Sequence, residues 1–162
     1  YAARRIRGER IRCGCFWYVE AVFQELKGVV SVTSGYTGGQ IAYPSYNEVA
    51  SGQTGHAEVT RIIYDPGVIS LDDLFEVFWA THNPTTLNRR GNDQGTQYRS
   101  GIWYTSSGHK MAALNSNSNV APSVCNDAIT TEIAPLGDFY PAEEYHQNYF
   151  LIIQIKVTAW AS

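Results

Sequence analysis

The sequence contains few cysteines and no long apolar stretch, and each shortage excludes a class of protein. Its 3 cysteines, Cys13, Cys15 and Cys125, cannot all pair within one molecule. The C-x-C of the first two has neither a second cysteine pair nor histidines at zinc-finger spacing beside it, so we expect no bound metal. No segment is apolar for long enough to cross a bilayer or to act as a secretory signal, so we expect no membrane partner.

An excess of basic residues is also missing. The 12 lysines and arginines are outnumbered by 15 aspartates and glutamates, which gives a net charge of -3. Nucleic-acid binders need a concentrated basic face, so we expect no nucleic-acid partner. We interpret the arginines that crowd into the first twelve residues as part of a solvated terminus. The glycine-rich segment 35–39 lacks the spacing of a phosphate-binding loop, which excludes a nucleotide cradle there.

Length and cysteine content bound the domain count and the compartment. A chain of 162 residues is the usual size of one domain with its own core, so we expect a single domain over residues 1–162. One working thiol suits a reducing compartment. We expect the cytoplasm, or an organelle if a targeting segment precedes Tyr1.

The order of the periodic segments predicts an α+β fold. Alternating apolar residues predict strands, and apolar residues at i, i+3, i+4 and i+7 predict helices. By these patterns the strands cover residues 9–13, 29–36, 56–65, 101–105, 128–134 and 151–160, and the helices cover residues 16–27, 71–82, 106–114 and 141–149. The polar run 115–119 is a poor continuation of the third helix. We expect a two-layer sandwich of helices on one mixed β-sheet, with long loops at 35–55 and 83–95 gathered at one edge.

Cys15 stands between a short strand-like run and the first predicted helix. In the first turn of a helix, unpaired backbone N–H groups and the positive end of the dipole favour an anion. Such a position lowers the pKa of a cysteine and raises the share of reactive thiolate. A buried structural cysteine fits the same position, because free cysteine is among the most buried residue types. The location alone leaves both interpretations open.

A nucleophilic thiol needs an acid or a base and groups that hold the oxygen of the substrate. The two long loops and the third predicted strand offer suitable side chains, namely Tyr46, His56, Glu58, Asp93 and Tyr98. One interpretation is a hydrolase in which Cys15, His56 and Asp93 act together. It lacks the local signature of the papain-type proteases and leaves Glu58 without a role.

Five short sequence blocks follow one another along the chain. They are G-C-F-W at 14–17, G-Y-T-G-G at 35–39, P-S-Y-N-E-V at 44–49, T-G-H-A-E at 54–58 and G-N-D-Q-G-T-Q-Y-R-S at 91–100. In their order and gaps these blocks resemble the motifs of the A-type peptide methionine sulfoxide reductases. The match runs from Cys13 to about Tyr104 and resumes more weakly at 130–134 and 145–149. Residues 1–12 and 150–162 lie outside it.

The resemblance implies how four side chains act on methionine sulfoxide. Cys15 attacks the sulfoxide sulfur, and Glu58 serves as the acid toward the oxygen. Two tyrosines, Tyr46 and Tyr98, hydrogen-bond that oxygen. The chemistry is consistent, because a sulfoxide oxygen leaves readily only once protonated and a carboxyl among aromatic side chains keeps its proton. Taken singly, the two tyrosines also fit ordinary half-buried positions, and Glu58 fits a salt bridge at a strand edge.

The resemblance also implies a substrate pocket. Phe16 and Trp17 form the apolar wall that receives the S-methyl group, and Asp93 orients the substrate. His56 is expected to support the site or the core and not to take part in the reaction.

The implied reaction is thiol-dependent reduction of methionine-S-sulfoxide, free or peptide-bound, to methionine. A sulfenic acid forms on Cys15 as the intermediate. The purpose is the repair of proteins oxidised under oxidative stress. No bound cofactor is implied, because an external thiol supplies the electrons, namely thioredoxin, glutaredoxin or glutathione. We expect a monomer.

The chain departs from the family at the residues that resolve the sulfenic acid. Ala50 stands where many members carry a recycling cysteine, and no cysteine follows Cys125. Cys13 is too close to Cys15 for a relaxed disulfide, which leaves Cys125 or an external thiol. The missing cysteine keeps an alternative open, a thiol redox sensor or methionine-binding module on the same scaffold that is not recycled.

Overall fold

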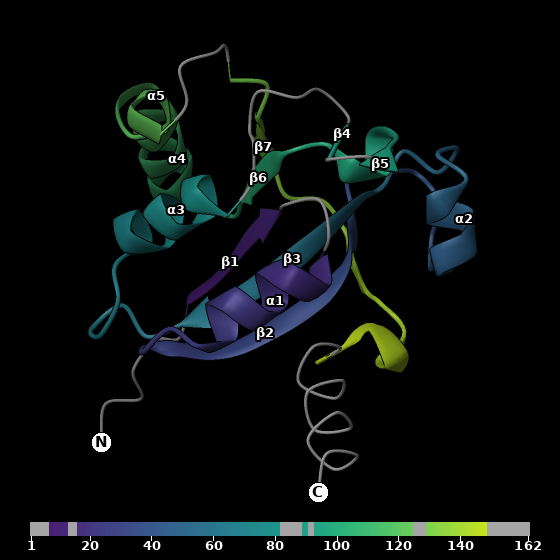
Figure 1. Ribbon diagram of the computed structural model, residues 1–162, viewed down its shortest axis with the longest axis horizontal. Coiled ribbons are helices and arrows are strands. Elements are labelled where there is room, and N and C mark those ends of the chain that lie inside the picture. Colours follow the sequence, from purple (N-terminus) through teal and green to yellow (C-terminus); the bar gives the residue numbers. More distant parts are fainter. Residues whose placement is uncertain (1–6, 13–15, 82–88, 91–92, 125–128, 149–162) are drawn as a thin grey trace, which may run out of the picture.

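The computed structural model describes residues 7–12, 16–81, 89–90, 93–124 and 129–148, and a sheet forms its centre (Figure 1). The 6 strands lie in the order β7-β6-β1-β3-β2-β8. Their bounds are β1 (Arg7–Arg12), β2 (Val29–Thr37), β3 (Ala57–Tyr64), β6 (Gly101–Tyr104), β7 (Glu132–Pro135) and β8 (Phe139–Pro141). Neighbouring strands are antiparallel except β6 and β7, which are parallel. The sheet is therefore mixed, as the sequence predicts.

Helices pack against one face of this sheet. Figure 1 shows α1 lying along β2 and β3, with α3, α4 and α5 grouped to its left and α2 apart on the right. The helices are α1 (Phe16–Gln24), α2 (Tyr46–Ala50), α3 (Leu71–Ala80), α4 (Ser107–Asn119) and α5 (Ala121–Val124), with 3-10 turns η1 (Thr96–Tyr98) and η2 (Glu144–His146). A small ribbon pairs β4 (Arg89–Arg90) with β5 (Asp93–Gln94). The predicted α+β class is confirmed. None of the helices in the described ranges is long and apolar enough to span a bilayer.

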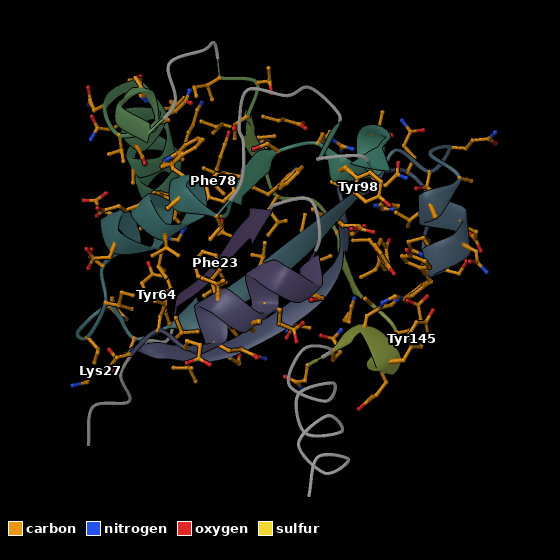
Figure 2. All side chains as sticks on the ribbon, viewed as in Figure 1. Phe23, Lys27, Tyr64, Phe78, Tyr98 and Tyr145 are labelled. Carbon is orange, nitrogen blue, oxygen red and sulfur yellow. The ribbon has the colours of Figure 1, made fainter. Side chains whose placement is uncertain are left out.

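One apolar core joins the helices to the sheet. Its buried side chains come from α1 (Val19, Phe23), β3 (Ile62, Tyr64), α3 (Leu74, Phe75, Phe78, Trp79), β6 (Ile102), α4 (Ala113) and α5 (Ala121). Figure 2 labels Phe23, Tyr64 and Phe78 of this core. Burial of one such side chain contributes about 1.5–3 kcal/mol to folding. Val19 and Phe23 belong to the apolar stripe that predicts the first helix, so the periodicity identifies the buried face correctly.

The alternation along β3 assigns its side chains to two faces of the sheet. Ile62 and Tyr64 lie in the core under the helices, whereas Ala57 and Val59 lie in a smaller cluster. Successive side chains of a strand point to opposite faces, so Glu58 shares the helix face with Ile62 and Tyr64. Its exposed fraction is 3%. The fold therefore places this carboxyl group under the helical layer and away from bulk water.

Local signals predict helix starts better than helix ends. α3 begins at Leu71, as the range predicted for this helix requires, and Ser70 before it forms a complete capping box. By contrast, α4 continues to Asn119 through the polar run that is predicted to end it near Leu114. Ser116, within that run, accepts a hydrogen bond of 2.7 Å from Nε1 of Trp79 in α3. This tertiary contact outweighs the weak helix propensity of Asn and Ser.

Several short elements lie where the sequence predicts a loop or a different structure. α2 lies within the loop predicted at 35–55. Where a helix is predicted to begin at Pro141, β8 ends instead, and the 3-10 turn η2 follows it. β8 forms because it pairs with β2, with Tyr140 opposite Tyr36. The strand predicted at 128–134 is β7, which begins later and pairs with β6. The strand predicted at 151–160 lies outside the described residues.

The segment that follows β8 is fastened to β2 and α1. The side-chain amide of Gln147 donates to the Ser34 carbonyl at 2.9 Å, and its oxygen accepts from the Ser34 N–H at 3.0 Å. The carboxyl group of Glu20, 1% exposed, accepts from the Ser34 hydroxyl and the Asn148 N–H. Burial raises the pKa of Glu20, and these two hydrogen bonds offset part of the rise.

The raised pKa of Glu20 predicts how stability depends on pH. The folded protein holds this proton to a higher pH than the unfolded chain, whose glutamate titrates near 4.5. The contribution of Glu20 to the free energy of unfolding is therefore largest below that pH and falls as pH rises through the folded-state pKa. Glu20→Gln removes this dependence. Urea unfolding between about pH 4 and 8 should show that the wild type loses stability relative to Glu20→Gln as pH rises.

The control for this measurement is Glu25→Gln, since Glu25 is an exposed glutamate that follows the same helix. Its stability profile should run parallel to that of the wild type. Parallel profiles for the wild type and Glu20→Gln would contradict the prediction.

Candidate active site

Four strand ends meet at one end of the sheet. The last residue of β1, Arg12, lies opposite Gly101, the first residue of β6. The last residue of β2, Thr37, lies opposite Ala57, the first residue of β3. α1 begins at Phe16, four positions after the last residue of β1. This end of the sheet therefore holds the start of β3 with the buried Glu58, the start of α1 and the start of β6.

Glu58 lies in a cross-strand pair with Tyr36 at this end of the sheet. Tyr36 is fully buried, and its hydroxyl donates to Oε2 of Glu143 at 2.9 Å. Burial raises the pKa of Tyr36 far above its usual range, and the hydrogen bond to Glu143 and the charge of Glu143 raise it further. Tyr36 is consequently a permanent proton donor that lies within electrostatic reach of both carboxyl groups.

The second oxygen of Glu143 holds Tyr46. Oε1 of Glu143 accepts from the Tyr46 N–H at 2.7 Å. This N–H belongs to the first turn of α2, where backbone donors have no partner within the helix. Partial burial acts to raise the pKa of Glu143, but hydrogen bonds from its own backbone, Tyr46 and Tyr36 outweigh it and lower the pKa. Glu143 is therefore an anion that joins two tyrosines from different elements.

The ring of Tyr46 also packs against this segment. His146 lies with its ring centroid 4.6 Å from that of Tyr46, and its Nε2 is 3.6 Å from Oε2 of Glu143. Burial lowers the pKa of His146, and the charge of Glu143 opposes that shift only in part. The histidine is thus a neutral ring against the tyrosine. The backbone and the ring of Tyr46 are both held by residues 143–146.

Tyr98 is the last residue of η1 (Figure 2). The residues on either side of it, Gln97 and Arg99, hydrogen-bond to neighbouring segments. Nε2 of Gln97 donates to the carbonyl of Ala50 at the end of α2, at 3.2 Å. The guanidinium of Arg99 donates to the carbonyl of Gly55 at 3.0 Å and to Glu132 at 3.0 Å. η1 also packs against β3. These contacts bring the turn that carries Tyr98 to the same end of the sheet as α2 and the start of β3.

Both ring nitrogens of His56 hydrogen-bond to the backbone of the loop that follows β2. Its Nδ1 accepts from the Gly39 N–H at 3.1 Å, so Nε2 carries the proton and donates to the Ile41 carbonyl at 2.7 Å. A Cβ at Gly39 would lie 2.4 Å from the backbone N of His56, so this contact requires a glycine. Because both ring nitrogens are occupied, His56 has none available to activate a thiol. The structure therefore does not support the hydrolase interpretation.

The remaining predicted site residues are described only in part. Phe16 and Trp17 open α1, and Asp93 begins β5, but the structure describes only the backbone of these three residues. Cys15 and Cys125 lie outside the described residues, although Arg12 and Phe16 on either side of Cys15 lie at this end of the sheet. Within the ranges that the structure describes, no cluster of three histidine, cysteine, aspartate or glutamate side chains is arranged to hold a metal.

Sequence reasoning missed Tyr36, Glu143 and His146. Tyr36 stands inside one of the five blocks, and the other two residues precede or enter the weaker block at 145–149. Their positions in or beside these blocks were the sequence signal that could have identified them. Their roles depend on the pairing of β8 with β2, which no local pattern predicts.

Known proteins share both the sequence and the fold. Residues 10–157 match the family model described as peptide methionine sulfoxide reductase. The peptide methionine sulfoxide reductase MsrA of Acinetobacter baumannii is 50% identical over 137 residues, which cover 85% of this chain and 78% of that protein. The MsrA of Methanothermobacter thermautotrophicus is 50% identical over 137 residues, with coverages of 84% and 81%. The MsrA of Vesicomyosocius okutanii is 47% identical over 137 residues, with coverages of 85% and 81%.

Solved structures agree with this similarity. The crystal structure of reduced Mxr1 from Saccharomyces cerevisiae superposes with a TM-score of 0.86 at 35% identity, covering 93% of this chain and 87% of that one. Methionine sulfoxide reductase A of Corynebacterium diphtheriae gives a TM-score of 0.79 at 34% identity, with coverages of 92% and 76%.

The chain belongs to the peptide methionine sulfoxide reductase family. It is an oxidoreductase of the A type, which reduces methionine sulfoxide and so repairs oxidised proteins. The five sequence blocks imply this family and the reduction of methionine sulfoxide, and both predictions are confirmed.

The bridge through Glu143 predicts a loss of activity in Glu143→Gln. Tyr36 and Tyr46 donate to different oxygens of Glu143, and an amide replaces one of these oxygens with an NH2 donor, so one of the two bonds is lost. If Tyr46 shifts by about 1 Å, kcat should fall by about ten- to a hundredfold with a much smaller change in KM. Tyr36→Phe leaves the bond to Tyr46 in place and should have a smaller effect. Steady-state kinetics with methionine sulfoxide measure both.

Glu144→Gln is the matched control, because Glu144 is the exposed neighbour and loses the same charge. Its kcat and KM should stay within about twofold of the wild type, as for surface substitutions away from such contacts. Equal kinetics for Glu143→Gln and Glu144→Gln would rule out the bridge as a positioning device.

Proposed function

We propose that Cys15 attacks the sulfur of methionine-S-sulfoxide while Glu58 donates a proton to the sulfoxide oxygen. The S–O bond of the substrate breaks, its oxygen passes to the cysteine sulfur, and the products are methionine and a sulfenic acid on Cys15. The observation that carries this proposal is the buried carboxyl of Glu58 beside Tyr36, whose partner Glu143 also holds Tyr46. A desolvated carboxyl group favours its protonated form, which the reaction requires.

Two tyrosines are proposed to hold the sulfoxide oxygen. Tyr46 and Tyr98 come from elements that Gln97 connects through its bond to the end of α2. A sulfoxide oxygen gains negative charge before it is protonated, and phenol donors held in place by the protein stabilise that charge. Phe16 and Trp17, at the start of α1, supply the apolar wall for the S-methyl group, and Asp93 orients the substrate.

The reductant and the biological setting remain proposals. Thioredoxin, glutaredoxin or glutathione returns Cys15 to the thiol, and the substrates are oxidised proteins or free methionine sulfoxide. One solved structure carries the description Mxr1 in complex with Trx2, but at 24% identity it supports the fold alone. We further propose a monomer that works in the cytoplasm. The assignment of residues 1–162 to one catalytic domain stays a prediction.

A sensor that reacts once is the second candidate function. It is favoured by Ala50, which occupies the expected place of a recycling cysteine at the end of α2. Such a module would bind or reduce one methionine sulfoxide and then stop. Repeated turnover with an excess of dithiol separates the enzyme from the sensor.

The reaction predicts turnover on one epimer. With dithiothreitol in excess, the protein should reduce the S epimer of a methionine sulfoxide peptide many times and leave the R epimer unchanged. Cys15→Ser should abolish turnover, because an alcohol cannot take up the oxygen as a sulfenic acid. Chromatography of the separated epimers measures both results. A single turnover per molecule would support the sensor, and no reaction with either epimer would refute the proposal.

The route of resolution is tested by mass. We propose that Cys125 or an external thiol resolves the sulfenic acid, and intact mass after one equivalent of substrate distinguishes the two. An internal disulfide loses two hydrogens relative to the reduced protein. Cys125→Ser should abolish that species if Cys125 is the resolving residue. A sulfenic acid that persists until glutathione or thioredoxin is added would assign resolution to the external thiol.

A further inference from the structure

A hollow of about 460 Å³ opens beside the proposed active site. It is lined by Tyr43, Pro44, Asp138, Phe139, Tyr140, Pro141 and Glu143. Two of these residues connect it to the site. Pro44 lies two positions before Tyr46, and Glu143 bonds to the Tyr46 N–H. The hollow therefore adjoins the tyrosine proposed to hold the sulfoxide oxygen.

The register of the sheet sets the distance between this hollow and Glu58. Glu58 on β3 lies opposite Tyr36 on β2, and Tyr36 lies opposite Tyr140 on β8. Residues directly opposite one another share a face, and adjacent strands lie about 4.8 Å apart. Tyr140 is thus about 10 Å from the proposed acid along the sheet, a distance that about three residues of extended polypeptide span. A substrate polypeptide bound through its methionine sulfoxide can reach the hollow.

Tyr43 gives the hollow an exposed aromatic wall. Its side chain is 87% exposed, and its backbone φ of 49° lies in the left-handed region that a tyrosine seldom adopts. Its ring meets that of Tyr140 edge to face at 5.2 Å. A large apolar ring that the fold holds in water in a strained conformation has no role in the core. Such strain is characteristic of ligand clamps.

The lining is aromatic and acidic. Asp138 and Glu143 contribute carboxylates, and the described lining residues include no lysine or arginine. One guanidinium, that of Arg61, lies over the Phe139 ring at 4.9 Å. Arg61 and Phe139 lie on the face of Ala57 and Val59, whereas Tyr140 shares the other face with Glu58. Aromatic faces and carboxylates together recognise a cation.

We propose that this hollow binds a lysine or arginine of an oxidised polypeptide substrate, about three residues away from the methionine sulfoxide. The inference rests on the proposed placement of the reaction at Glu58 and Tyr46. It names the preferred substrate class as protein segments with a basic residue near the oxidised methionine. The cation packs against Tyr43 and Tyr140 and pairs with Asp138.

The test is a scan of synthetic peptides. Each peptide carries one methionine-S-sulfoxide in a Gly/Ser background, with Lys, Gln or Glu at one position up to about three residues away on either side. At one or two positions kcat/KM should be about five- to tenfold higher for Lys than for Glu, with Gln between them. Asp138→Asn and Tyr43→Ala should each reduce that ratio to about twofold.

Two controls separate this inference from the reaction itself. Turnover of N-acetylmethionine-S-sulfoxide, which is too small to reach the hollow, should be unchanged in both variants. If the wild type does not turn over this small substrate, the proposed reaction itself is refuted. If only the binding role of the hollow is wrong, this turnover persists. Asp72→Asn, an exposed aspartate on α3, makes the same change of net charge and should leave the Lys preference intact.

Three outcomes would overturn the inference. They are equal rates for Lys and Glu at every position, a Lys preference that survives in both hollow variants, and an equal loss of preference in Asp72→Asn. The last would show that the overall charge attracts the peptide.

Discussion

The carboxylate of Glu143 is the interaction on which the arrangement of the site depends. It accepts the hydroxyl of Tyr36 and the N–H of Tyr46, groups that come from the second strand and from a short helix beyond it. A hydrogen bond to a charged acceptor contributes about 1.5–3 kcal/mol. Partial burial of the anion acts against this gain, but the lowered pKa of Glu143 shows that the hydrogen bonds prevail. That anion therefore gives the buried tyrosine and the short helix a shared hydrogen-bond acceptor.

The position of Glu143 depends in turn on the edge of the sheet. β8 pairs with β2, and Gln147 bonds to both backbone groups of Ser34 in the same strand. Glu20 in α1 fastens the next residue. The helix that follows the proposed nucleophile, the strand opposite the proposed acid and the segment that holds Tyr46 are therefore one connected structure.

The sequence predicts the parts of this structure that depend on local patterns. The alternation in 56–65 puts Glu58 on the face of Ile62 and Tyr64, and the helix predicted at 71–82 starts where α3 does, at Leu71. The patterns fail where contacts between distant residues decide the structure. The Asn/Ser run of α4 stays helical because it packs on α3 through Ser116. β8 is a strand only because β2 offers an open edge.

The same division applies to the site. The resemblance supplies the residues proposed to touch the substrate, whereas the residues that hold them emerge only from tertiary contacts. Ala50 shows why one departure from the family leaves this arrangement intact. Its carbonyl, not its side chain, receives the hydrogen bond of Gln97 that ties the turn of Tyr98 to α2. An alanine or a cysteine at this position therefore offers Gln97 the same backbone acceptor, because the side chain takes no part in this bond.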